Sequence, residues 1–434
     1  MSSIDPPEPV RQLVRTLEKA GFETWCVGGA VRDALLGHPH LDWDLATSAR
    51  PEQVRRLFRR TIPLGVEFGT VGVLDRDGRM HEITTFRRDI ETDGRHAVVT
   101  FGATLDEDLA RRDFTINAIA WSPTRELLHD PFDGRGDLGR RIVRTVGDPR
   151  DRMVEDRLRA LRAIRFAARF RFEIDPAAWA AIRESAPHLR RLSPERVRQE
   201  LEKTMEQVAA PSWAIERWNA SGAMAVLIPE LADPPPTLRA ALDYLSPPGP
   251  PNRADRVINR LTALFLPVPP ARLGRMLRDL RFSNSDSRWI ADLATRWHEL
   301  DDEMSRALLG TAPLDARIAR RWAARAGRTR LRALFRIAAA VWSARRAADE
   351  PAPLPHRVRD AYRVIRRTSL DPIEIADLAV DGEDLASAGI PAGPEVGRIL
   401  RALLETVLDD PARNTREHLL ATARSLSRPL ATEE

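Results

Sequence analysis

The stretch TWCVGGAVRD at residues 24–33, followed by LDWDLAT at residues 41–47, decides the fold of the N-terminal part of this chain. Four apolar or β-favouring residues at 24–27 predict a short strand, and the two glycines after them predict a tight turn. A helix is predicted over about residues 30–36, and a second strand follows it. The stretch therefore predicts an α/β unit organised around a Gly-Gly turn.

Two carboxylates, Asp42 and Asp44, lie two residues apart on the second predicted strand. Because residues i and i+2 of a strand project to the same face, they would lie side by side, which is unfavourable unless a cation lies between them. Mg²⁺ prefers such oxygen ligands and commonly shares them with substrate phosphates. Gly28 and Gly29 would let the backbone approach a ligand closely, and the helix after them would offer N–H groups to an anion. Together these features indicate phosphoryl or nucleotidyl transfer.

The composition is that of a folded, soluble protein of several domains. The 434 residues are 43% hydrophobic and 30% charged, and a single cysteine excludes a disulfide framework or a cysteine zinc site. We find no secretion signal and no apolar run of membrane-spanning length, so a cytoplasmic protein is expected. The net charge of +5 is carried almost entirely by arginine. A GC-rich genome explains this most simply, although arginine also suits phosphate contacts.

The chain consists of two consecutive parts that differ in their secondary-structure signals. Residues 1–145 alternate strand and helix signals, whereas strand signals vanish from about residue 150 and helical periodicity continues to the end. Within the first part, the polar, aperiodic segment 87–100 predicts a mobile loop. In the second part, residues 152–170 predict one long helix, and the prolines at 234–236 predict a connection between helical subdomains.

Two further segments carry groups that suit nucleotide chemistry. RRDFTINA at residues 111–118 places two arginines beside an aspartate and an asparagine, and EDRLRALRAIRF spans residues 155–166. On a continuous helix, Asp156 and Arg159 would lie one turn apart and face the same way. By itself such a pair is most simply a surface ion pair that contributes less than about 1 kcal/mol.

In this order, the four segments resemble the nucleotidyltransferase core of the polymerase-beta superfamily, in the form found in bacterial tRNA nucleotidyltransferases and poly(A) polymerases. The resemblance implies an α+β protein: a nucleotidyltransferase head with a small mixed sheet and helices, followed by an all-α neck, body and tail. We expect the head at residues 1–145, a neck that recognises the base at 146–232, a body at 233–365 and a tRNA-binding tail at 366–434.

The resemblance also assigns roles to individual residues. Asp42 and Asp44 would be the catalytic carboxylates that hold Mg²⁺, with Glu82 as the candidate third ligand or, equally, an exposed strand residue. The other implied residues bind the incoming nucleotide; they are Gly28, Gly29, Arg32, Arg112, Asp113, Asn117, Asp156, Arg159, Arg162 and Arg165. Among them, Arg162 and Arg165 would reach the triphosphate.

In the family, Asp156 and Arg159 would select the base. Cytosine and adenine both present an amino donor beside a ring-nitrogen acceptor, which a carboxylate and a guanidinium can match. Uracil and guanine present a carbonyl where the carboxylate lies, so one acceptor would stay unpaired, and unpaired buried groups discriminate strongly. This pair would therefore admit C and A and reject U and G without a nucleic-acid template.

Several functions remain open at this point. Residues 65–71 resemble the segment of tRNA enzymes rather than that of poly(A) polymerases, and residues 87–109 keep the full length expected of a complete CCA-adding enzyme. We therefore expect addition of CCA to tRNA from CTP and ATP, with no protein partner inferred. The alternatives are an A-adding enzyme of a split pair, a poly(A) polymerase, and an RNA-binding protein with an inactive head. The scattered histidines do not indicate a phosphohydrolase domain.

Overall fold

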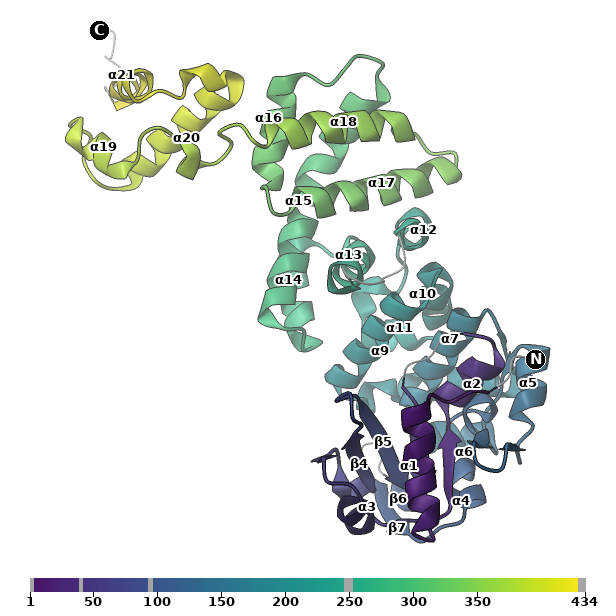
Figure 1. Cartoon of the computed structure of the whole chain (residues 1–434). Coiled ribbons are helices and arrows are strands. Elements are labelled where there is room, and N and C mark those ends of the chain that lie inside the picture. Colours follow the sequence, from purple (N-terminus) through teal and green to yellow (C-terminus); the bar gives the residue numbers. More distant parts are fainter. Residues whose placement is uncertain (1–3, 39–41, 93–96, 246–252, 428–434) are drawn as a thin grey trace. The chain divides into compact units, whose positions relative to one another are not determined.

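The computed structural model describes residues 4–38, 42–92, 97–245 and 253–427. The chain divides into two compact units, Met1–Asp233 (unit 1) and Pro234–Glu434 (unit 2). The predicted proline connection begins at this division. Figure 1 shows the sheet at the N-terminal end of the chain and helices in the rest of it.

Unit 1 contains a mixed sheet of seven strands in the order β3-β4-β5-β2-β1-β8-β9. The strands are β1 (Thr24–Val27), β2 (Asp44–Thr47), β3 (Thr61–Pro63), β4 (Thr70–Leu74), β5 (Met80–Thr85), β8 (Ala120–Ser122) and β9 (Leu127–His129). Strand β2 runs parallel to β5, and the other neighbours are antiparallel. The predicted strand–turn–helix–strand order is confirmed, with β1 over the predicted residues.

The first helices of unit 1 pack on this sheet, and the later helices pack on one another. They are α1 (Glu8–Lys19), α2 (Gly29–Leu35), α3 (Pro51–Leu57), α4 (Leu105–Ala110), α5 (Gly134–Arg140), α6 (Pro149–Glu155), α7 (Leu158–Phe170), α8 (Pro176–Ser185), α9 (Pro194–Gln207), α10 (Pro211–Ala220) and α11 (Ala223–Leu227). An apolar cluster that includes Trp25, Val27, Phe86 and Leu109 packs α4 against the interior strand β1 of the sheet.

Two sequence predictions about strands are wrong. The segment predicted as a loop instead contains β6 (Arg87–Thr92) and β7 (Ala97–Phe101), which pair as an antiparallel two-stranded sheet; residues 93–96 of the prediction lie outside the described residues. The β-branched run in β7 favours a strand, and the polar first half of the segment hid that signal. Strands also continue past residue 150, because β10 (Ile142–Val143) pairs in parallel with β11 (Glu173–Ile174).

The predicted long helix over 152–170 is also wrong, because two helices meet there at a break. Helix α6 ends at Glu155 and α7 begins at Leu158, and Asp156 between them is extended, with φ −146° and ψ 105°. The carboxylate of Asp156 accepts a hydrogen bond of 3.0 Å from the Leu158 N–H. A short acidic side chain competes with the helix for backbone N–H groups, which explains the break at this residue.

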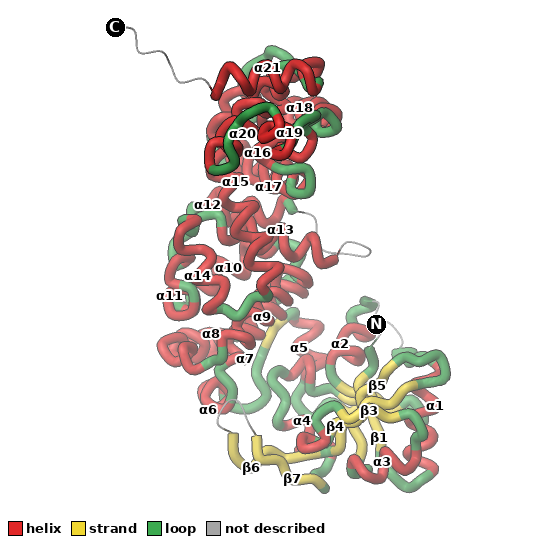
Figure 2. Tube along the Cα trace, turned by 90° about the vertical axis from the view of Figure 1, so that its left-hand side faces the viewer, coloured by secondary structure: helices red, strands yellow, loops and turns green. Residues whose placement is uncertain are grey.

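The described residues of unit 2 form helices and no strand (Figure 2). The helices are α12 (Pro236–Tyr244), α13 (Arg253–Phe265), α14 (Pro270–Asp279), α15 (Asn284–Leu309), α16 (Ala316–Ala326), α17 (Leu331–Ala347), α18 (Pro355–Thr368), α19 (Gly382–Ser387), α20 (Pro394–Asp409) and α21 (Arg416–Ser427). Trp322 and Trp342 are fully buried in this unit. Among the described helices, none is long and apolar enough to cross a membrane. The predicted α+β class, a mixed-sheet head followed by helices, is confirmed.

Candidate active site

An open pocket in unit 1, with a volume of about 480 Å³, gathers the predicted nucleotide-binding residues. Its lining residues come from the β1–α2 turn, β2, the segment after α4, and helices α7 and α9. They are Gly28, Gly29, Arg32, Asp44, Arg111, Arg112, Asp113, Asn117, Asp156, Arg159, Arg162, Arg165, Phe166, Arg169, Lys203 and Gln207. All ten predicted nucleotide-binding residues and Asp44 are among them. Asp42 and Glu82 are not.

Positive charge dominates this pocket. Seven arginines and one lysine line it, against three carboxylates. Gathering so many cations is unfavourable unless an anion of several charges binds among them. The pocket therefore fits a polyphosphate rather than a neutral ligand.

The β1–α2 turn lets the side chains of Asp44 and Arg112 approach the same point of the backbone. Gly28 has φ +73°, and a Cβ atom built there would lie 2.9 Å from Nη1 of Arg112 and 4.0 Å from Oδ2 of Asp44. A side chain at this position would be strained and would collide with the Arg112 guanidinium. Gly28 is thus required both for the turn and for the close approach of Arg112.

Asp44 stands at the start of β2, opposite Val27 of β1. Burial of the carboxyl group, together with the nearby Glu82 and Asp42 charges, raises the pKa of Asp44 to about 6, although Arg112 partly offsets this. Glu82 is close because β2 runs beside β5, with Leu45 opposite Ile83. Three carboxylates in one neighbourhood repel one another, and a hard divalent cation would relieve that repulsion.

Asp42 lies just before β2 rather than within it, so the predicted strand begins two residues later than expected. The alternation is nevertheless kept, because Trp43 is buried while the side chains of Asp42 and Asp44 reach solvent. Asp44 does so inside the open pocket, where the surrounding protein atoms still limit the hydration of its carboxyl group. Within the described residues, no three acidic, histidine or cysteine side chains already converge as a metal site. The metal-ligand set of Asp42, Asp44 and Glu82 therefore stays a prediction.

The segment after α4 is held against α7 by an ionic network. Asp113 accepts hydrogen bonds from Arg162 Nη2 at 2.6 Å and from Asn117 Nδ2 at 2.8 Å. Asn117 in turn accepts a hydrogen bond from Arg32, so residues from α2, a 3₁₀ turn (Thr115–Asn117) and α7 form one chain of contacts. These contacts brace the segment after α4 against α2 and α7.

The carboxylate of Asp113 is strongly stabilised as an anion. Burial alone would raise its pKa, but the Arg162 ion pair and the hydrogen bonds from Asn117 and the Phe114 N–H outweigh burial and lower the pKa to about 2. Since the pKa is lower in the folded state than the ordinary 3.8, Asp113 stabilises the fold above pH 4. That stabilisation is lost as the pH falls from about 4 to about 2.

We expect Asp113→Asn to lower the free energy of unfolding by about 2 kcal/mol at neutral pH, because a shift of one pKa unit corresponds to about 1.4 kcal/mol. The difference from the wild-type protein should shrink as the pH falls below 4. Urea unfolding of both full chains at pH 7, 5, 4 and 3 measures this. Asp77→Asn, an exposed aspartate in the β4–β5 turn, is the control; a difference that is independent of pH would contradict the assignment.

Helix α9 supplies a second layer of partners that the sequence analysis did not identify. Arg165 is 3% exposed and forms a buried ion pair with Glu200, and its Nη1 donates to Gln207 Oε1 at 2.9 Å. Glu200 lies on the buried face of α9 that also carries Val197, Leu201 and Thr204. This ion pair could have been suspected from the sequence, because a carboxylate at a buried position of an amphipathic helix requires a cationic partner.

The two residues expected to select the base lie in the same pocket but not on one helix face. Asp156, in the break before α7, accepts a hydrogen bond from Arg196 Nη2 at 2.8 Å. Arg159 pairs with Glu155 at 2.7 Å and donates to the Arg111 carbonyl at 3.2 Å. The side chains of Asp156 and Arg159 are therefore held by different partners, and each is oriented independently of the other. The same-face argument for the pair was wrong, although both side chains line the pocket.

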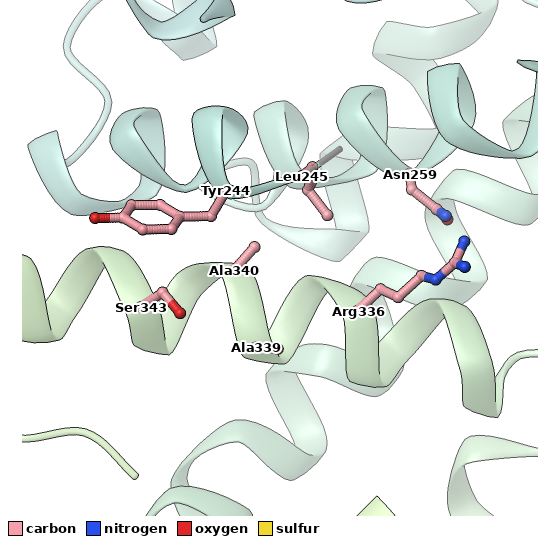
Figure 3. Close-up of a pocket in the computed structure, with 7 residues that line it drawn as sticks. All are labelled: Tyr244, Leu245, Asn259, Arg336, Ala339, Ala340 and Ser343. Carbon is pink, nitrogen blue, oxygen red and sulfur yellow. The ribbon is translucent and has the colours of Figure 1, made fainter. Parts of the chain in front are cut away.

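A separate cavity of about 270 Å³ lies in unit 2, and the sequence analysis did not predict it (Figure 3). Apolar groups of Leu245, Ala339 and Ala340 form much of its lining, and Asn259 and Arg336 lie together at one end of it. None of its seven lining residues is a carboxylate. It therefore lacks the acidic and polycationic groups that distinguish the pocket of unit 1.

Comparison with known proteins places the whole chain in one family. Residues 24–144 match the "Poly A polymerase head domain", residues 171–233 the "Probable RNA and SrmB- binding site of polymerase A", and residues 257–423 tRNA nucleotidyltransferase domain 2. The CCA-adding enzyme of Limosilactobacillus fermentum is 34% identical over 426 residues, which cover 96% of this chain and 97% of that protein.

Two more relatives agree with this placement. The CCA-adding enzyme of Streptococcus mutans is 44% identical over 212 residues, or 48% of this chain and 52% of that protein. The crystal structure of the Bacillus stearothermophilus CCA-adding enzyme in complex with CTP superimposes with a TM-score of 0.76 at 32% identity, covering 97% of this chain and 98% of that one. The pocket, the sheet order and these matches agree: the chain belongs to the tRNA nucleotidyltransferase and poly(A) polymerase family of nucleotidyltransferases.

Proposed function

We propose that this protein is a CCA-adding enzyme, which adds C and A nucleotides to the 3′ end of tRNA from CTP and ATP and releases pyrophosphate. The observation that carries the proposal is the pocket of unit 1, in which Asp44 and eight cationic side chains lie around the Gly28 turn. A carboxylate that suits a metal, next to a polycationic cradle, is the arrangement that nucleotidyl transfer requires. Two of the CCA-adding enzymes named above, those of Limosilactobacillus fermentum and Bacillus stearothermophilus, match nearly the whole length of this chain.

A divalent metal is part of this proposal, and we propose Mg²⁺. Asp42, Asp44 and Glu82 would hold it, since their mutual repulsion raises the pKa of Asp44 and oxygen ligands suit this ion. When bound, Mg²⁺ would supply a lower pKa for the 3′-hydroxyl of the tRNA and would neutralise charge on the leaving pyrophosphate.

The arginines of the pocket would bind and orient the triphosphate. Arg112 lies against Gly28 and close to Asp44, so it would hold a phosphate next to the metal ligands. Arg162 and Arg165 on α7 would hold the outer phosphates, and planar guanidinium groups suit that bidentate contact. Fixing the triphosphate in line with the attacking hydroxyl accelerates the reaction by lowering its entropic barrier.

Asp156 and Arg159 would read the base edge. Asp156 has used one hydrogen bond on Leu158 and one on Arg196, and a carboxylate can accept about four, so it can also accept from an amino group of C or A. Arg159 is fixed by Glu155 and by a backbone carbonyl, which limits its freedom to adapt to a wrong base. Pre-oriented groups of this kind give selectivity because they do not rearrange around U or G.

The tRNA would be held partly by unit 2. A groove of about 680 Å³ between α17 and α18 is lined by Arg332, Arg336, Arg359 and Arg366, with Tyr362 among them. Arginines together with an aromatic side chain suit the phosphates and bases of RNA. We place the reaction in the cytoplasm, where tRNA is matured.

Three tRNA transcripts test the proposal, ending before CCA, after the first C, and after CC. Each would receive labelled CTP, ATP or both, with Mg²⁺, and the products would be sized on a gel. Extension of all three to a full CCA end is the expected result. Extension of only the CC-ended transcript would instead identify an A-adding enzyme, and long A tails on any RNA a poly(A) polymerase. No incorporation would favour an RNA-binding protein with an inactive head.

A further inference from the structure

A row of aromatic rings lies beneath the cationic side of the pocket. Phe166 and Phe170 on α7 are stacked, with ring centroids 6.1 Å apart and planes 7° apart. Phe114 meets Phe166 edge to face at 5.7 Å, and Phe172 continues the row 5.7 Å from Phe170. Phe166 is 5% exposed and lines the pocket, so its ring borders the space that the ligand would occupy.

Three arginines of the pocket lie over the ring of Phe166. The guanidinium carbon of Arg165 is 4.4 Å from the ring centroid, that of Arg32 is 5.1 Å away and that of Arg162 is 5.3 Å away. Arg32 comes from α2, more than a hundred residues before the other two. Arginines from two different helices, α2 and α7, therefore contact the same ring, that of Phe166.

Each of these arginines already pairs with one carboxylate: Arg32 with Asp33, Arg162 with Asp113 and Arg165 with Glu200. Burial lowers the pKa of Arg32 and of Arg165 in spite of their acidic partners Asp33 and Glu200. The negative face of an aromatic ring attracts a cation, most strongly where water is excluded. Unlike a carboxylate, the ring carries no net charge, so it supports the guanidinium groups without competing with phosphate oxygens for them.

We propose that Phe166 is a positioning residue for the triphosphate: its ring face fixes Arg32, Arg162 and Arg165 in the places from which they bind phosphate. This inference rests on the proposed binding of CTP and ATP in this pocket. It assigns a function to a side chain that has no hydrogen-bonding group.

Phe166→Leu tests the proposal, with Phe172→Leu as the matched control. Phe172 is also 5% exposed and belongs to the same aromatic row, but among the described residues no arginine lies over its ring. We expect Phe166→Leu to raise the KM for both CTP and ATP about tenfold with kcat changed less than about threefold, because cation–π contacts act on binding. The affinity for pyrophosphate should fall by the same factor, and the preference for CTP over UTP should not change.

A fluorinated series separates the ring's electrostatics from its packing. Replacing Phe166 by mono-, di- and trifluorophenylalanine weakens the negative face stepwise while nearly keeping the size of the ring. We expect the dissociation constant of pyrophosphate, measured by calorimetry, to rise with each fluorine at position 166 and to stay constant for the same series at position 172. This series also decides the question if Phe166→Leu does not fold.

Two outcomes would overturn the proposal. One is a pyrophosphate affinity that does not respond to fluorination of Phe166. The other is an equal rise of KM for Phe166→Leu and Phe172→Leu, which would indicate loss of packing alone. Failure of the proposed function has a different signature, because the wild-type enzyme would then bind pyrophosphate and yet extend no tRNA transcript.

Discussion

Asp44→Asn is expected to lower kcat for nucleotide addition by about 10³-fold or more, since a bound metal supplies several kcal/mol of transition-state stabilisation and each 1.4 kcal/mol is a factor of ten. Asp44 is the predicted metal ligand that lines the pocket, next to Gly28 and Arg112. Single-turnover extension of a CC-ended tRNA with ATP measures the loss. Asp77→Asn, an exposed aspartate outside the pocket, should leave the rate unchanged.

The same variant should not lose stability, and this separates its catalytic role from a structural one. The pKa of Asp44 is raised to about 6, so the folded state holds its ionised carboxylate less favourably than the unfolded chain does. Its contribution to stability therefore falls as the pH rises from about 4 to above 6. In the absence of metal at pH 7.5, the neutral Asn should give an equal or higher Tm. A rate within tenfold of wild type would refute the metal assignment.

Asp156→Ala is expected to reduce the preference for CTP over UTP by about 10³-fold, because a site built to pair with a donor rejects an analogue that lacks it by about 10⁴ or more. The carboxylate lines the pocket and is fixed by Leu158 and Arg196. The ratio of kcat/KM for CTP and UTP, measured on a tRNA that ends before CCA, gives the result. Asp151→Ala, an exposed aspartate on α6, is the control.

Asp156 also accepts a hydrogen bond from the first N–H of α7, so a second variant must separate selection from helix stability. A Ser side chain can accept the same hydrogen bond, whereas loss of a side-chain hydrogen bond to a helix N–H costs about 1 kcal/mol. We therefore expect Asp156→Ser to keep a near wild-type Tm and still to incorporate UTP. A variant that rejected UTP as well as the wild-type enzyme does would show that base selection lies elsewhere.

Local pattern was enough to predict the elements around the Gly28 turn. Strand β1, the turn and helix α2 depend on residues within a few positions of one another, and the structure confirms them. The ten residues expected to bind the nucleotide were named from the family resemblance, and the structure places all ten in one pocket. Whether each performs its assigned role stays a prediction.

Local pattern failed where two local preferences competed. The periodicity of residues 152–170 favours one helix, but the Asp156 side chain takes the Leu158 N–H and breaks it in two. In residues 87–100, the polar first half concealed the pairing of β6 with β7. In both places two local structures are close in free energy, and hydrogen bonds that the sequence pattern does not reveal decide which of them forms.

The sequence by itself determined which chemical groups this protein has and the periodic elements that carry them. Only the tertiary structure decided which groups meet. Asp113 and Arg162 are 49 residues apart, and Arg165 and Glu200 are 35 apart. Such pairs form because the burial of apolar helix faces brings α7 against α9 and the 3₁₀ turn, and charges carried into that interface must find partners there. The ring of Phe166 became the support of three arginines for the same reason.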